Sequence, residues 1–376
     1  MTQNEKPLLM PSSRDSVEKR QNSTGAVLFV MPHLSFGGAE RLASHILRDL
    51  VQSGTRCSVA VVTRNRRIPD AASSWFAPVC PVHMIVGDVD PALSLRAIIQ
   101  AEDVATVVLC GRSPAYEWLG SLVAQFPHLR IVTFQFNAVD SIDENSLFSS
   151  FIDATIVECH DAATQLVAAG MPEHKMALIP SGVDVPSLAC RILPERGARP
   201  ICVAFVGRFD KTKNPEGYIR MAAVLRRSDI SLLMVGTGKL MLRMRLLAFQ
   251  LGLYRQLVFR GLLDGEAHQQ QMDSIDILVV PSRIDGRPLV IQEAKSRGIA
   301  VVAHSVGGIP ELVEHGVTGL LCPPDDPAAL ARAVARLIDD GDLRHRLGQA
   351  GKEDALRNGN LADRLPLYKS VITGRQ

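Results

Sequence analysis

The sequence predicts an α/β protein built from two doubly wound, Rossmann-like parallel sheets that face each other across a cleft. From residue 26 onward, short apolar runs rich in Val and Ile alternate with longer amphipathic segments. Strands that are apolar throughout are typical of parallel sheets covered by helices on both faces. The alternation stops once, around residue 190, and then restarts. A chain of 376 residues is long enough for two such domains.

The first domain is expected over residues 25–190. An amphipathic helix is predicted over 39–54, directly after the first strand. Residues 1–24 are polar and carry only a four-residue apolar patch, too short for a secretory signal core, so we expect a disordered tail there. The predicted strands of this domain are 26–32, 57–63, 104–110, 130–136, 154–159 and 175–184.

A stretch rich in Pro, Arg and Gly, residues 185–200, is the predicted linker, and the second domain is expected over 197–358. Residues 359–376 form a weakly helical segment that can cap either domain, including by packing back on the first. The predicted strands of the second domain are 201–207, 230–236, 256–261, 275–281, 300–304 and 319–324.

Composition excludes several classes of function. Lys and Arg number 41 against 39 for Asp and Glu, and the net charge of +2 gives no reason to expect a nucleic-acid partner. Seven scattered cysteines and ten dispersed histidines have no metal-ligand spacing, so we expect reduced thiols and no metal ion. No run approaches the roughly 18 apolar residues of a membrane span, and we expect a soluble, cytoplasmic protein.

Two glycine-containing loops are candidates for phosphate binding at the carboxyl ends of strands, where open parallel sheets bind ligands. Gly37 and Gly38 in "LSFGGAERLASHIL" allow close approach to a bound group, although a simple tight turn explains them equally well. In "AFVGRFDKTKN", Gly207 is followed by three cations, including Arg208 and Lys213, which suit a diphosphate. The alternative is a solvated basic loop.

The stretch "SRIDGRPLVIQEAKSRG" predicts a loop followed by a helix with Pro288 at its first position. The amides of Leu289 and Val290 at the start of this helix can then receive an anion. "MVGTGKL" places Gly236 in a GxG turn after a strand, which by itself is weak evidence for a nucleotide site.

Two carboxylates of the same stretch can face the cleft at different depths. Asp285 lies in the loop and Glu293 about one and a half turns inside the helix. Ionised carboxylates accept hydrogen bonds and therefore suit sugar hydroxyls. The alternative makes Asp285 a capping residue and Glu293 the partner of a nearby cation.

Residues 239–260 contain five basic residues and no acidic one. An ordinary sheet-covering helix followed by a strand is the favoured interpretation. The open alternative is a basic amphipathic surface that meets anionic lipid, which would allow peripheral contact with the inner face of the membrane.

Six motifs, in this order, resemble those of the GT4-type (glycosyltransferase group 1) retaining glycosyltransferases of the GT-B fold, and the resemblance covers nearly the whole chain from about residue 26. They are "GGAERLA", "VGRFDKTKN", "VGTG", "FRGLL", "DILVVPSRIDGRPLVIQEA" and "VVAHSVGGIPELVEHGVTGLLCPPDDPAAL".

The resemblance implies roles for particular residues. Arg208 and Lys213 would hold the diphosphate of a nucleotide-sugar donor and neutralise the leaving group, and Asp285 would contact the donor sugar; these three are the implied catalytic residues. The implied donor-binding residues are Gly37, Gly38, Gly207, Gly236, Leu263, Leu289, Val290 and Glu293, of which Glu293 would bind the ribose.

Three positions depart from the family pattern. Asp285 replaces the more usual Glu, Arg287 stands where an apolar residue is common, and Gln135 stands where relatives often carry a histidine. Gln135, Asn137 and Arg287 are therefore candidates for contacts with the sugar or the acceptor. His160 is expected to be structural.

The predicted function is metal-independent transfer of a hexose from a nucleotide-diphosphate sugar to an acceptor hydroxyl with retention of configuration, and no cofactor beyond the donor. The pathway expected is synthesis of a glycan, a glycolipid or a glycosylated metabolite. Epimerases and phosphorylases share the fold. A non-catalytic nucleotide-sugar-binding or scaffold protein is the main alternative, whereas an NAD-dependent oxidoreductase is disfavoured because no full GxGxxG motif is present.

Overall fold

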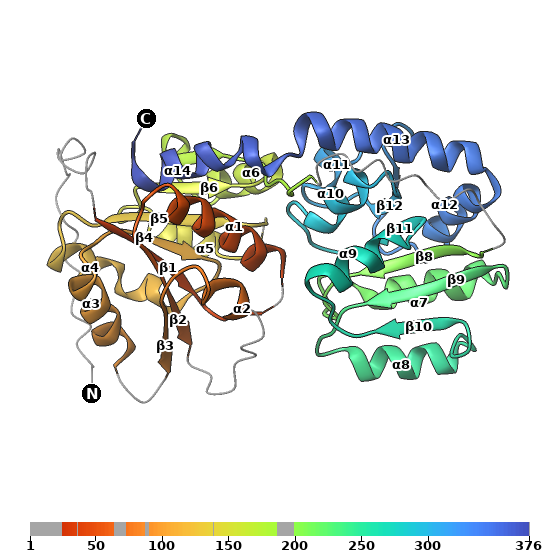
Figure 1. The fold of residues 1–376 in the computed structure, drawn as a ribbon, viewed down its shortest axis with the longest axis horizontal. Coiled ribbons are helices and arrows are strands. Elements are labelled where there is room, and N and C mark those ends of the chain that lie inside the picture. Colours follow the sequence, from red (N-terminus) through yellow and green to blue (C-terminus); the bar gives the residue numbers. More distant parts are fainter. Residues whose placement is uncertain are drawn as a thin grey trace, which may run out of the picture.

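The computed structural model describes residues 25–35, 37–63, 73–86, 90–137, 139–185 and 199–375. They form two α/β domains side by side, each with a parallel sheet between helices (Figure 1). The predicted fold class is therefore confirmed. The expected tail and most of the expected linker lie outside the described residues. The boundaries at 25–190 and 197–358 stay predictions, because the junction at 186–198 is not described.

The sheet of the first domain has seven parallel strands in the order β3-β2-β1-β4-β5-β6-β7. The six predicted strands are present, together with a seventh, β3, that the sequence pattern did not predict. That strand lies at the sheet edge and carries the half-buried His83, so it lacks a continuous apolar run. The strands are β1 Ala26–Met31, β2 Cys57–Thr63, β3 Val82–Val86, β4 Val104–Cys110, β5 Arg130–Gln135, β6 Ala154–Val157 and β7 Met176–Leu178.

Both faces of this sheet are buried. Along β1, Leu28 and Val30 pack into the core on one face, and Val27 and Phe29 pack into the core on the other. This explains why the strand is apolar at every position. The helices of the domain are α1 Gly38–Gln52, α2 Ser73–Phe76, α3 Pro91–Ala101, η2 Pro114–Trp118, α4 Leu119–Gln125, α5 Ile142–Leu147, α6 His160–Ala168 and η3 Glu173–Lys175.

The sheet of the second domain has six parallel strands in the order β10-β9-β8-β11-β12-β13. All six predicted strands are present. They are β8 Ile201–Val206, β9 Ile230–Val235, β10 Leu257–Arg260, β11 Ile277–Val280, β12 Ala300–His304 and β13 Leu320–Cys322. The helices that cover them are α7 Pro215–Leu225, α8 Met241–Gln250, α9 Gly265–Asp273, α10 Leu289–Ser296, α11 Ile309–Leu312, α12 Pro327–Asp339 and α13 Gly341–Asn358.

One helix boundary differs from the prediction. Pro288 is the N-cap of α10 rather than its first helical residue, because its ψ of 115° is still extended. The free amides at the start of the helix are unaffected, since Leu289 and Val290 begin its first turn.

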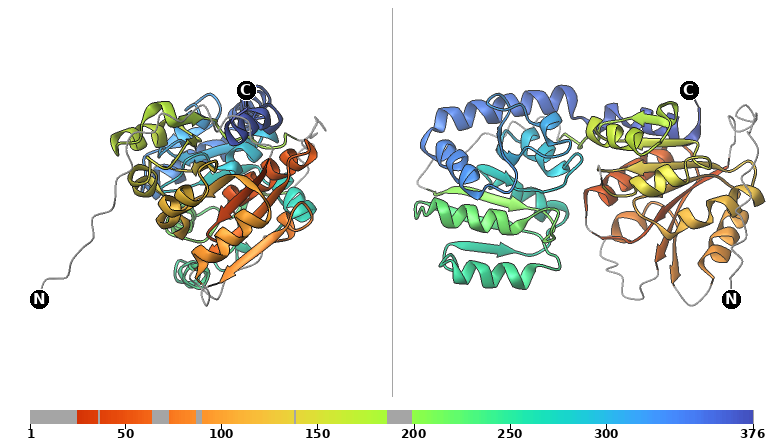
Figure 2. Two further views of the ribbon diagram at one scale, coloured as in Figure 1. Left: turned by 90° about the vertical axis from the view of Figure 1, so that its left-hand side faces the viewer. Right: turned by 180° about the vertical axis from the view of Figure 1, so that it is seen from behind.

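The end of the chain returns to the first domain. After α13 and the short η4 Leu361–Asp363, helix α14 Leu365–Thr373 packs against α1, β4 and β6 (Figures 1 and 2). Tyr368 is fully buried there: its ring stacks on Phe134 with 5.9 Å between centroids, and its hydroxyl donates to the Ile179 carbonyl at 3.3 Å. The chain thus crosses between the domains twice. No helix within the described ranges is both long and apolar enough to cross a membrane.

Candidate active site

The strand order predicts where a ligand binds. In the first sheet the order reverses between β1 and β4, and in the second between β8 and β11. Ligands of open parallel sheets bind beyond the carboxyl ends of the strands at such points. The loops that follow β1, β8 and β11 contain Gly37, Lys213 and Asp285 respectively.

The basic loop after β8 is held in one conformation by Asp210. Its Oδ1 accepts hydrogen bonds from the Thr212 amide at 3.0 Å, the Thr212 hydroxyl at 2.6 Å and the Lys213 amide at 2.9 Å. Its Oδ2 lies 3.0 Å from Nε of Arg208. Burial raises the pKa of Asp210, but the bonds to Thr212 and Lys213 and the charge of Arg208 bring it below its ordinary value. The loop is therefore an ordered element rather than a freely solvated one.

Lys213 and Asp285 come together from loops 72 residues apart in sequence. Nζ of Lys213 lies 2.7 Å from Oδ2 of Asp285, and the Ser282 hydroxyl donates to the same oxygen at 2.9 Å. The two loops are also joined by the backbone, because the Arg283 amide donates to the Thr212 carbonyl at 2.8 Å. The buried Asp285 thus has its cationic partner in place.

Glu293 is buried on α10 and is contacted from both domains. Arg41 of α1 reaches its Oε1 from the first domain, and Nε2 of His268 on α9 lies 3.0 Å from its Oε2. Burial raises the pKa of Glu293, yet His268, Arg41 and Arg297 together hold it below its ordinary value. The carboxylate therefore stays ionised. Sequence reasoning missed Arg41 and His268, although Arg41 belongs to the quoted "GGAERLA" motif.

The start of α10 touches the first domain. A Cβ atom added to Gly38 would lie 3.5 Å from Cγ of Leu289, an ordinary contact distance, so the start of α1 lies directly beside the start of α10. The side chain of Leu289 packs against the core of the first domain, and Val290 packs in the second. Gly37 is the N-cap of α1 in an extended conformation.

Two glycines bring the loops after β8 and β9 together. Gly236 has a φ of +126°, and a Cβ there would lie only 2.0 Å from the Gly207 carbonyl oxygen, so no other residue fits. Leu263 is half-buried just before α9, and its neighbour Asp264 accepts a hydrogen bond from Nε1 of Trp75 in the first domain at 2.8 Å.

The loop around Asp285 is tightly packed between the domains. A Cβ on Gly286 would lie 1.8 Å from the Phe136 carbonyl oxygen of the first domain. On the other side, the Gly308 amide donates to the Asp285 carbonyl at 3.1 Å. The backbone on both sides of Asp285 is thus fixed by contacts.

Comparison with known proteins identifies the second domain. Residues 194–354 match the family model described as "Glycosyl transferases group 1". This domain belongs to the glycosyl transferases group 1 family. The implied donor-binding residues from Gly207 to Glu293 lie within the matched range. We call the second domain the group 1 domain.

Curated relatives match part of this chain. An uncharacterised glycosyltransferase of Methanocaldococcus jannaschii is 33% identical over 40% of this chain and 39% of its own. The alpha-D-kanosaminyltransferase of Streptomyces kanamyceticus is 34% identical over the same shares. The D-inositol 3-phosphate glycosyltransferase of Corynebacterium efficiens is 32% identical over 58% of this chain and 53% of its own. The chain thus spans about half or less of the length of these relatives in the matched regions.

Solved structures match both domains. Anabaena HepE in complex with UDP and glucose has a TM-score of 0.77 and 18% identity, covering 93% of this chain and 99% of its own. Sucrose-phosphate synthase from Thermosynechococcus elongatus has a TM-score of 0.75 and 20% identity, covering 93% and 100%. At this identity the likeness shows the fold: a GT-B arrangement in which the group 1 domain faces a second parallel-sheet domain.

Two of the three residues that depart from the family pattern, Gln135 and Arg287, form hydrogen bonds within the protein. Both N–H groups of the Gln135 amide donate to carbonyls of Asn137 and Asp140, and its oxygen accepts from Asn145 at 2.7 Å. This fully buried side chain supports a loop, which argues against the predicted sugar contact. Asn137 likewise bonds within that loop, to Val139 and Asp140.

Arg287 of the group 1 domain bonds to the first domain. Its Nε donates to the Ser181 carbonyl at 3.0 Å, near the crossing between the domains. His160 also lies at the interface: Glu311 accepts from its backbone amide at 2.8 Å, and the His160 ring lies 3.0 Å from the same carboxylate. This contact agrees with the structural role expected for His160.

Glu158 is a buried carboxyl group that sequence reasoning missed. It follows β6 at the carboxyl edge of the first sheet. Burial raises its pKa to about 8, although Arg287 and Ser181 act in the opposite direction. The sequence feature that could have identified Glu158 is its position, as a charged residue directly after the apolar run of β6. Within the described residues, no group of three or more His, Cys, Asp or Glu side chains could hold a metal ion.

Proposed function

We propose that the protein transfers a hexose from a nucleotide-diphosphate sugar to an acceptor hydroxyl, with retention of configuration and without a metal ion. The observation that carries this proposal is the contact of Lys213 with Asp285 between the loops that follow β8 and β11, in the group 1 domain whose helix α10 also carries the ionised Glu293. The named relatives are glycosyltransferases, and HepE binds UDP and glucose in the same fold.

In this proposal the donor diphosphate lies between the basic loop and the start of α10. Arg208 and Lys213 supply positive charge, and the free amides of Leu289 and Val290 supply hydrogen-bond donors. These cations and amides are already oriented toward the departing diphosphate and stabilise the negative charge that develops on it. This stabilisation lowers the barrier to breaking the bond between the sugar and the diphosphate. Asp285 fixes Lys213 and contacts the donor sugar.

Glu293 binds the ribose hydroxyls of the donor. It is ionised and can accept hydrogen bonds, but Arg41 already occupies one of its oxygens. His268 contacts the other oxygen, so the ribose hydroxyls would use the remaining lone pairs of both oxygens. Retention follows if the acceptor oxygen bonds to the anomeric carbon on the face from which the diphosphate departs, while the departing diphosphate takes the acceptor proton. The resemblance to retaining transferases supports this step.

Donor turnover tests the proposal. The purified protein is incubated with UDP-, GDP- and ADP-sugars, and free nucleotide is measured by chromatography with water and with a panel of hydroxyl acceptors. We expect one nucleotide family to stabilise the protein thermally and to be turned over. Lys213→Ala should lower turnover by about a hundredfold. Arg346→Ala, which removes an exposed cation of α13 outside this loop, is the control and should retain turnover.

Other outcomes would replace the proposal. Stabilisation by NAD alone would favour an oxidoreductase. Binding of a nucleotide sugar without release of nucleotide to any acceptor would favour the non-catalytic alternative.

We also propose that α8 contacts anionic lipid, which would place the acceptor reaction at a membrane surface. Leu242, Leu246 and Phe249 recur at helical spacing and are 82%, 57% and 64% exposed. Lys239 and Arg245 lie in the same basic stretch. Figure 1 shows α8 beside β10, at the edge of the second sheet. Exposed apolar groups among cations are typical of helices that bind lipid surfaces.

Vesicle sedimentation tests this contact. The wild-type protein should bind phosphatidylglycerol vesicles and not phosphatidylcholine vesicles, and Leu242→Ser with Phe249→Ser should abolish binding. Equal sedimentation of the wild type and the double variant would remove α8 from the interaction. Because both side chains are exposed, the thermal midpoint of the variant should match that of the wild type.

A further inference from the structure

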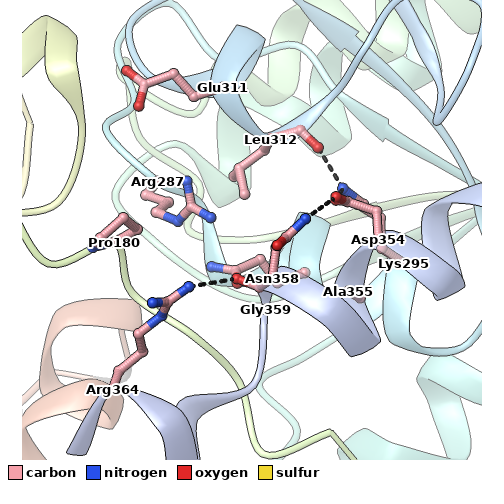
Figure 3. Close-up of a pocket in the computed structure, with 11 residues that line it drawn as sticks. Pro180, Arg287, Lys295, Glu311, Leu312, Asp354, Ala355, Asn358, Gly359 and Arg364 are labelled. Atoms are coloured by element: carbon pink, nitrogen blue, oxygen red, sulfur yellow. Dashed lines mark hydrogen bonds and ion pairs between the residues drawn. The ribbon is translucent and has the colours of Figure 1, made fainter.

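A cavity of about 230 Å³ lies where the chain crosses between the two domains (Figure 3). Pro180 precedes the first crossing, and Arg364 follows the second at the start of α14. Arg287 and Gln292 line the cavity from the second domain. An occupant would therefore touch residues that move with each domain.

Gln292 is a polar side chain that lacks partners. It is 2% exposed, and within the described residues neither Nε2 nor Oε1 of its amide has a hydrogen-bond partner. Leaving such groups unsatisfied costs about 1–3 kcal/mol each, so a buried amide normally has a partner. Gln292 precedes Glu293 on α10, and the cavity is thus on a different face of the helix from the Glu293 carboxylate.

Two arginines bring positive charge to the cavity without a direct ion pair, although Glu158 and Glu311 interact with Arg287 electrostatically. Among the described residues neither Arg287 nor Arg364 forms an ion pair: Arg287 donates to the Ser181 carbonyl, and Arg364 donates to the Asn358 carbonyl at 3.1 Å. Nε of Arg364 is buried without a partner. Figure 3 shows both arginines on the Pro180 side of the cavity.

The other charged groups of the cavity are paired. Lys295 contacts Asp354, and Glu311 accepts from the backbone and ring of His160. They leave Arg287 and Arg364 as the cations available to a ligand. Guanidinium groups bind phosphate and carboxylate oxygens through paired N–H groups, and an amide can donate to the same oxygens.

We propose that this cavity binds a small oxyanion, a phosphate monoester or a carboxylate, at a site separate from the donor site. The volume is smaller than the ~300–1,000 Å³ of pockets for drug-sized ligands, which excludes a nucleotide sugar and admits a molecule of a few carbons. Because the site is lined by residues attached to both domains, its occupant favours one angle between the domains and thereby regulates cleft closure.

Calorimetry with the full chain tests the site without relying on transferase activity. Inorganic phosphate, glycerol 3-phosphate and citrate are titrated at constant ionic strength, with and without saturating UDP. We expect at least one of them to bind in both conditions. Gln292→Leu and Arg364→Met should weaken that binding at least about tenfold. Arg357→Met, an exposed arginine on α13, is the control and should bind like the wild type.

Several results would contradict the proposed anion site. They are the absence of binding, displacement of the anion by UDP, loss of binding in Lys213→Ala, or unchanged binding in the Gln292 and Arg364 variants. Gln292→Glu gives an independent check with little change in shape. The new carboxylate should take the place of the anion beside the arginines, raise the thermal midpoint without ligand and remove the shift caused by the anion. A lowered midpoint would contradict the proposed charge balance.

Discussion

At the scale of single residues, Glu158 couples protonation to folding. Its pKa is raised from 4.5 to about 8 in the folded protein, chiefly by burial. Between these two pH values the folded state holds a proton that the unfolded chain releases. The contribution of Glu158 to stability is therefore fully present below about pH 4.5, falls as the pH rises, and is lost once the pH passes about 8.

Replacing Glu158 by Gln should remove this pH dependence while keeping the shape of the side chain. Relative to the variant, the wild type should lose up to a few kcal/mol of unfolding free energy between about pH 5 and pH 8.5. Urea unfolding of both proteins across this range measures it. Parallel pH profiles would show that Glu158 does not hold a proton in the folded state.

Glu293 differs from Glu158 because cations surround it. Burial alone would raise its pKa, but His268, Arg41 and Arg297 keep the carboxylate ionised. Glu293→Gln retains the shape and removes the charge, so the affinity for UDP should fall at least about tenfold. Calorimetry with UDP measures this, with Glu314→Gln as an exposed control on the same domain. Undiminished affinity in Glu293→Gln would exclude the proposed ribose contact.

At the scale of elements, Asn214 joins α7 to the loop after β11. It is the N-cap of α7 with a φ of +51°, and its side chain accepts from the Gly217 amide at 3.1 Å. Its Nδ2 donates to the Pro281 carbonyl at 3.0 Å. The same residue thus ends the basic loop, starts a helix and fixes the segment that leads to Asp285.

Asn214→Ala should destabilise the protein by about 1–3 kcal/mol, because it removes a cap and a buried hydrogen bond from a left-handed position. Asn214→Gly loses the same bonds but relieves the backbone, so its loss should be smaller. Chemical denaturation of the three proteins measures both. If alanine is tolerated as well as asparagine, the cap is not a determinant of stability.

At the scale of the whole molecule, α14 attaches the end of the chain to the first domain. Tyr368 is its fully buried anchor, whereas Leu367 on the same helix is exposed. Tyr368→Ala should cost about 3–5 kcal/mol, as expected for loss of a buried aromatic side chain, and should expose α14 to hydrogen exchange. Leu367→Ala is the control. Retained protection of α14 in Tyr368→Ala would show that the helix is held by other contacts.

Local sequence patterns accounted for most of the fold and for part of the site. Apolar runs located twelve of the strands, and β3 escaped because an edge strand need not be apolar on both faces. Lys213 and Asp285 were recognisable because each lies in a loop directly after a strand. The start of α10 was placed one residue early at Pro288, since proline suits both a cap and a first turn.

The sequence by itself determined the fold class, the two repeats of strand and helix, and the loops that bear charge, because these depend on local periodicity and on residues close along the chain. Only the tertiary structure decided that Arg41 contacts Glu293, that Gln135 is buried, that burial raises the pKa of Glu158, and that Gln292 lines a cavity between the domains. Contact and desolvation depend on which distant segments pack together. No local pattern encodes that packing.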